Sequence, residues 1–349
     1  MRRRDFVGSL AATALATRFT PRRILRNWTW VHGDASLTPQ EWTARFSRLR
    51  AAGIDAVLVG GGETGMLAHA AESAGLRFHR WVWMLNRSGD AWVKEQHPEW
   101  FTVSRNGESS LEKPPYVAYY QWLCPTRPEV RKYLVRQVAD VASHPRVHGV
   151  HLDYIRHCDV ILPSGLWAKY GLVQDHEMAA FDFCYCSACR QAFRQQHGQD
   201  PIDLPDPAAS AQWRRFRYDS VTGLVRDLAA AVKDARKRIT AAVFPTPAIA
   251  RTLVRQSWDE WPLDAFFPML YNGFYKQGLP WIGAGVREDV AALPAGRPVY
   301  AGLYLPDLTP DALATAVRTA ADAGATGVSL FEMNGLTDEH ARALLAASG

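Results

Sequence analysis

The sequence has no run of about 18 consecutive apolar residues, the length that a membrane-spanning helix needs, so we expect no membrane segment in the mature chain. It has no low-complexity tract, and 48% of its 349 residues are hydrophobic, which is enough for a large folded core. It also lacks the P-loop, HExxH and G-x-S-x-G motifs, so nothing indicates the chemistry that those motifs serve.

Outside its N-terminal 26 residues, the chain also has no excess of positive charge. The formal net charge is +5, but residues 1–26 contain seven arginines and a single acidic residue. The remaining residues contain 33 basic and 34 acidic side chains, a balance of −1. We therefore expect no nucleic-acid partner.

The N-terminus resembles an export signal. Arg2, Arg3 and Arg4 precede Phe6, and a mildly apolar stretch follows to residue 16 and ends in Ala-Leu-Ala. Paired arginines, a short apolar region and an A-x-A site predict a twin-arginine signal peptide and leader over residues 1–26. The expected partner is the twin-arginine export machinery, and the expected location is periplasmic or extracellular. The alternative is a frayed basic terminus without a targeting role.

Eight apolar runs with strand character recur along the chain, most of them separated by a segment with helical periodicity. Several read as near-continuous apolar strings, such as AVLV and GVSLF, which is typical of parallel strands buried on both faces. The runs are Asn27–Gly33, Ala56–Gly61, Arg77–Leu85, Val147–Tyr154, Ile239–Pro245, Ala265–Tyr271, Pro298–Leu305 and Gly327–Met333. Helical patterns cover Pro39–Ala52, Thr64–Ala74, Arg127–Ala142, Ala211–Arg236 and Pro310–Ala323. We predict an α/β fold, a single (β/α)8 TIM barrel over residues 27–349.

Two connections are longer than a turn requires. Residues 86–125 follow the third strand and are rich in Trp and Tyr, and residues 157–210 follow the fourth strand and contain a cysteine cluster. Both begin at the C-terminal ends of strands, where barrels place their active sites.

Carboxylates, aromatic rings and amides stand at the predicted strand ends. Rings stack on the apolar faces of sugars, while amides and carboxylates bind hydroxyl groups, so this combination indicates a sugar site. The residues that we expect to contact substrate are Trp30, His32, Glu63, Trp83, Asn86, His151, Arg156, Tyr271, Asn272 and Tyr304.

Two carboxylates are the candidate catalytic groups. Asp153 in GVHLDYIRH ends an apolar strand where a core residue would be apolar, and we expect Arg156 to lower its pKa, with His151 also tuning it. We interpret Asp153 as nucleophile or base. Glu332 in GVSLFEMNG is the expected proton donor, with Glu63 and Asp307 as rivals. The alternatives are a salt bridge between Asp153 and Arg156 that only shapes the barrel mouth, and a purely structural Glu332.

The fourth strand carries a family resemblance. HGVHLDYIRH, preceded by LCPTRPEVRKYLVRQV, resembles bacterial glycosyl-hydrolase-like (family 10-like) barrels in which this strand reads H-L-D-Y-I-R-Y-P. The resemblance covers most of the chain from Trp28, and this chain has His157-Cys158 where the family often has Tyr-Pro. It implies a secreted carbohydrate-active enzyme with a catalytic Asp153.

Five cysteines occur, and three of them lie within six residues in CYCSAC. This C-x-C-x₂-C spacing suits one tetrahedral Zn²⁺ with Cys184, Cys186, Cys189 and, as a fourth ligand, Cys124. The segment FCYCSACRQAFRQ is similar to the cysteine cluster of family 42 β-galactosidases, which implies a structural zinc site completed by an upstream cysteine. The alternative is a disulfide with free thiols.

A glycine-rich turn, Gly60–Gly65, fits the dinucleotide pattern G-x-G-x-x-G, but no acidic residue follows the next strand to bind a ribose. We interpret it as a turn that brings the backbone close to the barrel mouth. The function hypothesis is an exported glycoside hydrolase acting on an oligo- or polysaccharide. The alternatives are a carbohydrate-binding barrel without catalysis and an NAD-dependent oxidoreductase.

Overall fold

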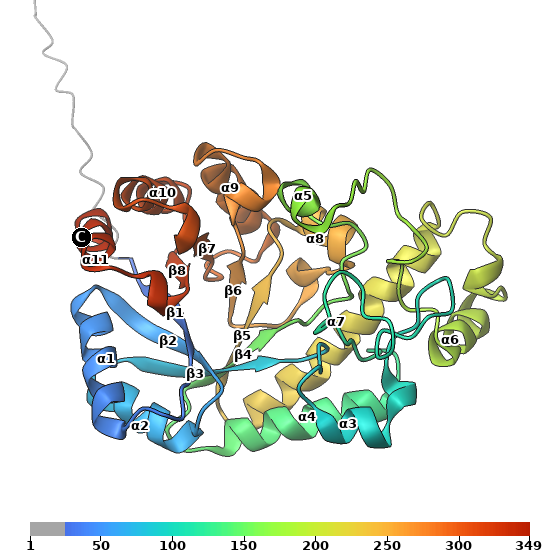
Figure 1. Cartoon of the computed structure of the whole chain (residues 1–349), viewed down its shortest axis with the longest axis horizontal. Coiled ribbons are helices and arrows are strands. Elements are labelled where there is room, and N and C mark those ends of the chain that lie inside the picture. Colours follow the sequence, from blue (N-terminus) through green and yellow to red (C-terminus); the bar gives the residue numbers. More distant parts are fainter. Residues whose placement is uncertain (1–24) are drawn as a thin grey trace, which may run out of the picture.

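The computed structural model describes residues 25–349, so the predicted signal peptide and leader at residues 1–26 lie outside the described residues except for the last two (Figure 1). Among the described residues, no helix has the length and apolar character that crossing a bilayer requires.

Eight parallel strands form the sheet, in the order β6-β5-β4-β3-β2-β1-β8-β7. A parallel bridge between Phe266 and Val299 joins β6 to the residue before β7 and closes the barrel. The strands are β1 (Asn27–His32), β2 (Ile54–Gly60), β3 (Arg77–Trp83), β4 (Gly149–Asp153), β5 (Arg238–Val243), β6 (Ala265–Pro268), β7 (Tyr300–Tyr304) and β8 (Gly327–Phe331). The predicted (β/α)8 barrel is confirmed, and each predicted run overlaps one strand.

Helices surround the barrel as an outer layer (Figure 1). The longer ones are α1 (Pro39–Ala51), α2 (Thr64–Ser73), α4 (Pro128–Ser143), α7 (Ala211–Asp234), α8 (Pro247–Val254), α9 (Pro280–Ala292), α10 (Pro310–Asp322) and α11 (Asp338–Ser348). Local sequence sets their starts. At α1 the Thr38 hydroxyl accepts a hydrogen bond from the Glu41 backbone, while the Glu41 carboxylate accepts one from the Thr38 backbone at 2.8 Å. This reciprocal capping satisfies N–H groups that have no partner within the helix.

The long connections carry helices of their own. The connection after β3 contains α3 (Ala91–Gln96) and η1 (Pro98–Trp100). The connection after β4 contains η2 (Ser164–Leu166), α5 (Trp167–Tyr170), α6 (Ser187–His197) and η3 (Pro201–Asp203). The part with α6 extends beyond the ring of helices on one side of the molecule (Figure 1). Short turns follow later strands: η4 (Trp258–Glu260), η5 (Asn272–Tyr275), η6 (Leu305–Asp307) and η7 (Met333–Gly335).

Aromatic side chains fill the inside of the barrel. One buried cluster contains Trp28, Trp30, Leu58, Trp81 and Phe267, contributed by the first, second, third and sixth strands. Larger apolar clusters between the strands and the helices form the rest of the core. The inside of the barrel is therefore a packed core.

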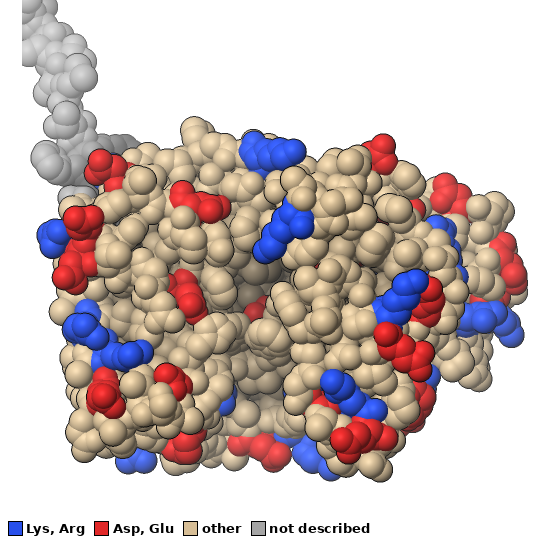
Figure 2. All heavy atoms as spheres, viewed as in Figure 1, with Lys and Arg blue, Asp and Glu red and all other residues tan. Residues whose placement is uncertain are grey.

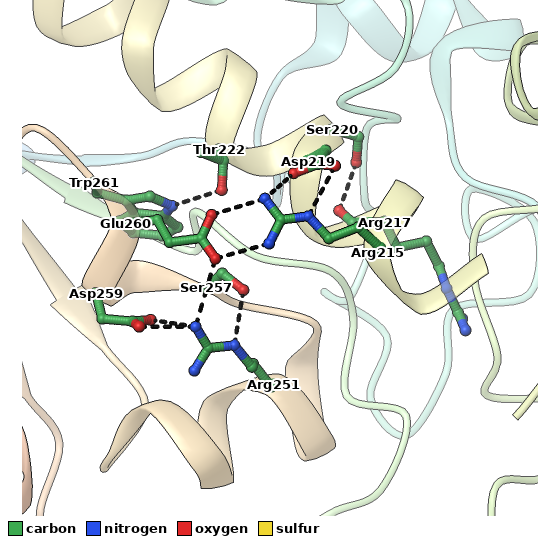
Figure 3. A network of polar contacts seen from close by, with 10 residues as sticks. All are labelled: Arg215, Arg217, Asp219, Ser220, Thr222, Arg251, Ser257, Asp259, Glu260 and Trp261. Atoms are coloured by element: carbon green, nitrogen blue, oxygen red, sulfur yellow. Dashed lines mark hydrogen bonds and ion pairs between the residues drawn. The ribbon is translucent and has the colours of Figure 1, made fainter. Parts of the chain in front are cut away.

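An ion-pair network fixes α7 to the segment after α8 (Figure 3). The Arg215 guanidinium donates to both carboxylate oxygens of Glu260, each at 2.9 Å. Arg251 on α8 in turn donates to Asp259 at 2.7 and 2.8 Å. These contacts hold the long α7 against the connection between β5 and β6.

Candidate active site

A cavity of about 410 Å³ opens where the strands end, and we call it the barrel cavity. Figure 2 shows it as a deep hollow at the centre of this face, with acidic atoms at its edge and inside it. More than half of its lining residues are aromatic. They are Trp30, Trp81, Trp83, Tyr116, Tyr119, Tyr120, Tyr154, Tyr170, Phe244, Tyr271, Phe274, Tyr275, Tyr304 and Phe331.

Asp153, the last residue of β4, places its carboxylate in the barrel cavity. Its Oδ2 accepts a hydrogen bond from the indole Nε1 of Trp81 at 2.9 Å, and its Oδ1 accepts one from the backbone N–H of Tyr154 at 2.7 Å. Both bonds favour the ionised form, but the loss of hydration has the larger effect and raises the pKa of Asp153 above its ordinary value. A more basic carboxylate is a stronger base or nucleophile at neutral pH.

Arg156 has a different partner from the one that we predicted. Its Nη1 donates to Asp159 Oδ2 at 2.8 Å, and its guanidinium lies over the rings of Trp122 and Phe244, 4.8 Å from each centroid. It favours the ionised form of Asp153 only at longer range, so the expected net lowering of the Asp153 pKa is replaced by a rise. The salt bridge between Asp153 and Arg156, which was the alternative to a catalytic Asp153, is not among the ion pairs of the described residues.

The predicted aromatic platform lies around the cavity. On one side, the ring of Trp83 lies 4.6 Å from that of Tyr154. On another, Tyr304 is 5.5 Å from Tyr271 and stacks against Phe331 at 6.2 Å. Burial raises the pKa of Tyr271 well above its ordinary value, so its hydroxyl stays neutral and can donate a hydrogen bond. Trp30, nearly fully buried, lies deeper in the barrel and also lines the cavity.

Glu332 follows β8 and contacts a neighbouring strand end instead of lining the cavity. Its Oε2 lies 3.2 Å from Nε2 of His32, and its Oε1 accepts a hydrogen bond from Nδ2 of Asn334 at 3.2 Å. His32 does line the cavity, with 52% of its side chain exposed, and its ring packs against Trp81 at 4.9 Å. His32 and Asp153 thus contact the same indole.

Four residues that we expected to contact substrate lie elsewhere, and their positions differ from the prediction. Glu63 caps α2, where it accepts hydrogen bonds from the backbone of Gly65 and Met66. Asn272 donates to the backbone of Gln277 at 2.8 Å.

The other two are buried. Asn86 pairs by its backbone with Trp122. His151 lies inside the barrel, where its Nδ1 is 2.9 Å from the Thr240 hydroxyl, and burial lowers its pKa well below the ordinary value, so the ring is neutral. Of the rival acids, Asp307 is exposed on η6, and its carboxylate lies against Gly273.

The backbone groups of the glycine-rich turn already contact other residues of the protein. A Cβ on Gly33 would come within 2.6 Å of the Gly61 carbonyl oxygen, so the two backbone segments pass as closely as glycine allows. Arg80 donates to the Gly61 carbonyl at 2.6 Å, and the Glu63 carboxylate occupies the N–H groups at the start of α2. These N–H groups are the ones that a dinucleotide phosphate would need.

Four buried cysteines, Cys124, Cys184, Cys186 and Cys189, form what we call the cysteine cluster. All four sulfur atoms lie within 4.8 Å of one another, so the cluster could bind a metal ion. Backbone N–H groups of Val103 and Cys186 point at the Cys184 sulfur, each at 3.5 Å. All four cysteines are free thiols, as is the fifth, Cys158, which is buried outside the cluster. The alternative of a disulfide is therefore not found among the described residues.

Several cavity residues were missed by the sequence analysis as site residues. Trp81 lies within β3, two residues before its end, and only strand-end residues were considered as site candidates. Tyr154 and Asp159 lie beyond the end of β4, where strand periodicity gives no direction for a side chain. The aromatic content of residues 86–125 was a usable signal, because Tyr116, Tyr119 and Tyr120 all line the cavity.

The geometry can be compared with known proteins. The family model described as Glycosyl hydrolase-like 10 matches residues 60–160, which include β3, β4 and Asp153. Among solved structures, the glycoside hydrolase domain of PgaB (BpsB) from Bordetella bronchiseptica is similar with a TM-score of 0.65 at 13% identity, over 93% of this chain and 99% of that one. The catalytic domain of a β-amylase from Paenibacillus polymyxa has a TM-score of 0.61 at 11% identity, over 92% and 96%.

A β-galactosidase from Rahnella sp. R3 is similar with a TM-score of 0.64 at 13% identity, over 94% of this chain and 56% of that one. A search of curated proteins found no match to the sequence. The matches confirm the predicted resemblance to glycosyl-hydrolase-like barrels, and the fold that the chain shares with the solved structures is a TIM barrel.

Proposed function

We propose that the protein is an exported glycoside hydrolase that cleaves an oligo- or polysaccharide in the barrel cavity. The observation that carries this proposal is the Asp153 carboxylate, held by two N–H donors in an aromatic-lined cavity and not ion-paired to any described residue. Aromatic rings bind the apolar faces of sugars, and a fixed carboxylate beside them is the group that glycosidic bond cleavage requires.

Asp153 acts as nucleophile or base in this proposal. It attacks the anomeric carbon, or takes a proton from the water that attacks it, while an acid protonates the leaving oxygen. The acid is Glu332 or the imidazole of His32, which lies 3.2 Å from it and lines the cavity. Tyr271, Tyr304, Trp30 and Trp83 bind the sugar rings.

The cysteine cluster holds a structural zinc ion in this account. Four thiolates fill a tetrahedral Zn²⁺ shell and leave no open position for substrate or water, so the metal has no part in catalysis. N–H groups aimed at the Cys184 sulfur support this, because such bonds stabilise a thiolate. Cys124 comes from the connection after β3 and the other three ligands from the connection after β4, so the ion joins the two long loops.

The proposal is tested by product release. The mature protein is incubated with a panel of plant and bacterial glycans, beside Asp153→Asn and the control Asp307→Asn, whose carboxylate does not line the cavity. We expect release by the wild type and by Asp307→Asn, and a fall of about a thousandfold or more in Asp153→Asn, the scale of a group that acts in the chemical step. Equal release by the Asp153→Asn protein would contradict the proposal.

The second candidate is a carbohydrate-binding barrel without catalysis, and the aromatic lining of the cavity favours it equally. Binding of glycans without product release from any of them would support this candidate over hydrolysis.

A further inference from the structure

Few side chains of the barrel cavity can supply a proton to a leaving group. The lining residues with ionisable groups other than tyrosine are His32, Asp153, Arg156, Asp159 and Lys169. Arg156 and Asp159 form a buried ion pair at 2.8 Å and neutralise one another. Lysine and arginine retain their protons near neutral pH, whereas imidazole exchanges its proton between about pH 5 and 8.

Glu332 is placed to hold an imidazole and not to contact a sugar. Its side chain is absent from the cavity lining, and its Oε1 accepts a hydrogen bond from Asn334 at 3.2 Å. Its Oε2 is buried, accepts no hydrogen bond from the described residues and lies 3.2 Å from Nε2 of His32, close enough for an ion pair with a protonated imidazole. A carboxylate beside one imidazole nitrogen fixes the tautomer and the orientation of the ring and stabilises its positive charge.

His32 lines the cavity and has a second ring nitrogen besides the one near Glu332. Because Nε2 lies 3.2 Å from Glu332 Oε2, Nδ1 is the remaining position for a proton, and it makes no hydrogen bond within residues 25–349. The imidazole packs against the Trp81 indole at 4.9 Å, and the same indole donates to Asp153. His32 and Asp153 are therefore held by one rigid ring, with both facing the same cavity.

We propose that His32 is the catalytic proton donor and that Glu332 is a positioning residue that holds its imidazolium. This assignment rests on the proposed glycoside hydrolase function. The bond between the anomeric carbon and the leaving oxygen breaks, its electron pair stays on that oxygen, and the oxygen takes the proton from Nδ1. The attacking water supplies hydroxide to the sugar, and its proton returns to His32 directly or through Asp153, so the cycle closes.

The test compares two substrates with the same sugar but different leaving groups. One leaves as a sugar alcohol and needs protonation, and the other leaves as 2,4-dinitrophenolate and does not. For His32→Gln we expect kcat/KM on the first substrate to fall by about 10²- to 10⁴-fold, the usual contribution of general acid catalysis. On the second substrate we expect a loss of less than about tenfold, because no proton is transferred there.

Glu332→Gln should show the same dependence on the leaving group with a smaller loss, about tenfold on the first substrate, since the imidazole remains but is less well held. His69→Gln, which replaces an exposed histidine on α2, is the matched control and should leave both rates unchanged. The melting temperature of each variant is measured to verify that it is folded.

Two results would overturn the assignment alone. One is an equal loss on both substrates in His32→Gln, which would indicate a binding role. The other is a leaving-group-dependent loss in Glu332→Gln with none in His32→Gln, which would make Glu332 the donor. A wild type that turns over neither substrate would overturn the proposed function and this assignment with it.

Discussion

The barrel cavity and the cysteine cluster both involve the long connections after β3 and β4. They differ in whether their ionisable groups are enclosed by one another or face open space. In the cluster, four sulfurs face one another within 4.8 Å and are shielded from solvent. In the cavity, Asp153 has two N–H donors and faces open space. A closed set of ligands suits a structural role, and an open carboxylate suits chemistry. Stability and activity should therefore respond to different residues.

The largest effect is expected from the cluster. Cys184→Ala should remove one of four zinc ligands and lower the free energy of unfolding by about 4 kcal/mol or more, as losses of metal sites do. Cys158→Ala, a buried cysteine outside the cluster, is the matched control and should cost only about 1 kcal/mol. Zinc content and denaturant unfolding measure both. Less than half an equivalent of zinc in the wild type, or equal losses in the two variants, would contradict the zinc assignment.

An intermediate effect, now on activity, is expected from Trp81→Phe. This change removes the N–H that binds Asp153 Oδ2 and keeps an aromatic ring. A hydrogen bond to a charged group contributes about 1.5–3 kcal/mol, so kcat should fall by about ten- to a hundredfold.

The control for Trp81→Phe is Trp42→Phe, because the buried Trp42 on α1 also donates its indole N–H, to the Asp34 carbonyl at 3.2 Å, but lies outside the cavity. Its kcat should equal that of the wild type, while both variants lose comparable stability. Equal kcat values in the two variants would show that the hydrogen bond from Trp81 to Asp153 does not contribute to catalysis.

The smallest effect concerns stability and pH. Burial raises the pKa of Asp153 and, more strongly, that of Asp289 on α9, whose carboxylate oxygens have no hydrogen-bond partner among the described residues. The folded state then holds these protons more tightly than the unfolded state, so the free energy of unfolding falls as the pH rises from about 4 through the folded pKa.

Replacement of either carboxyl by the neutral amide removes its contribution to the fall in the free energy of unfolding with rising pH. Asp153→Asn and Asp289→Asn should therefore unfold at higher urea concentrations than the wild type at pH 7, with the difference shrinking toward pH 4. The gain should be larger for Asp289→Asn, which should also retain full activity because Asp289 lies outside the cavity. Differences from the wild type that do not change with pH would show that neither carboxyl carries a raised pKa.

The strands could be predicted because a strand that is buried on both faces is a short run of apolar residues, and each of the eight predicted runs overlaps a strand. The positions of Asp153, Tyr304 and Trp83 followed directly, since each is the last residue of its strand. Closure of the barrel could be inferred only from the number of units, because pairing between β6 and β7 depends on contacts that no local pattern encodes.

The positions of the other site residues depend on how deep a side chain lies in the barrel and on the conformation of the loops. The sequence pattern predicts neither. His151 points into the barrel like Asp153 but lies two residues earlier, one layer deeper, and so reaches Thr240 and not the cavity. Asn86 lies three residues beyond β3, where the chain turns back to pair with Trp122. Arg156 could reach several carboxylates, and only the path of the following loop selects Asp159.

The central claim is that Asp153 performs chemistry in the barrel cavity and does not merely bind sugar there. The most direct measurement is a paired titration and turnover assay of the wild type and Asp153→Asn on one glycan that the wild type cleaves. We predict a dissociation constant within about threefold of the wild-type value and a kcat lower by about a thousandfold or more, because the carboxylate acts in the transition state. Equal kcat values, or a loss of affinity that accounts for the whole loss of kcat/KM, would contradict the account.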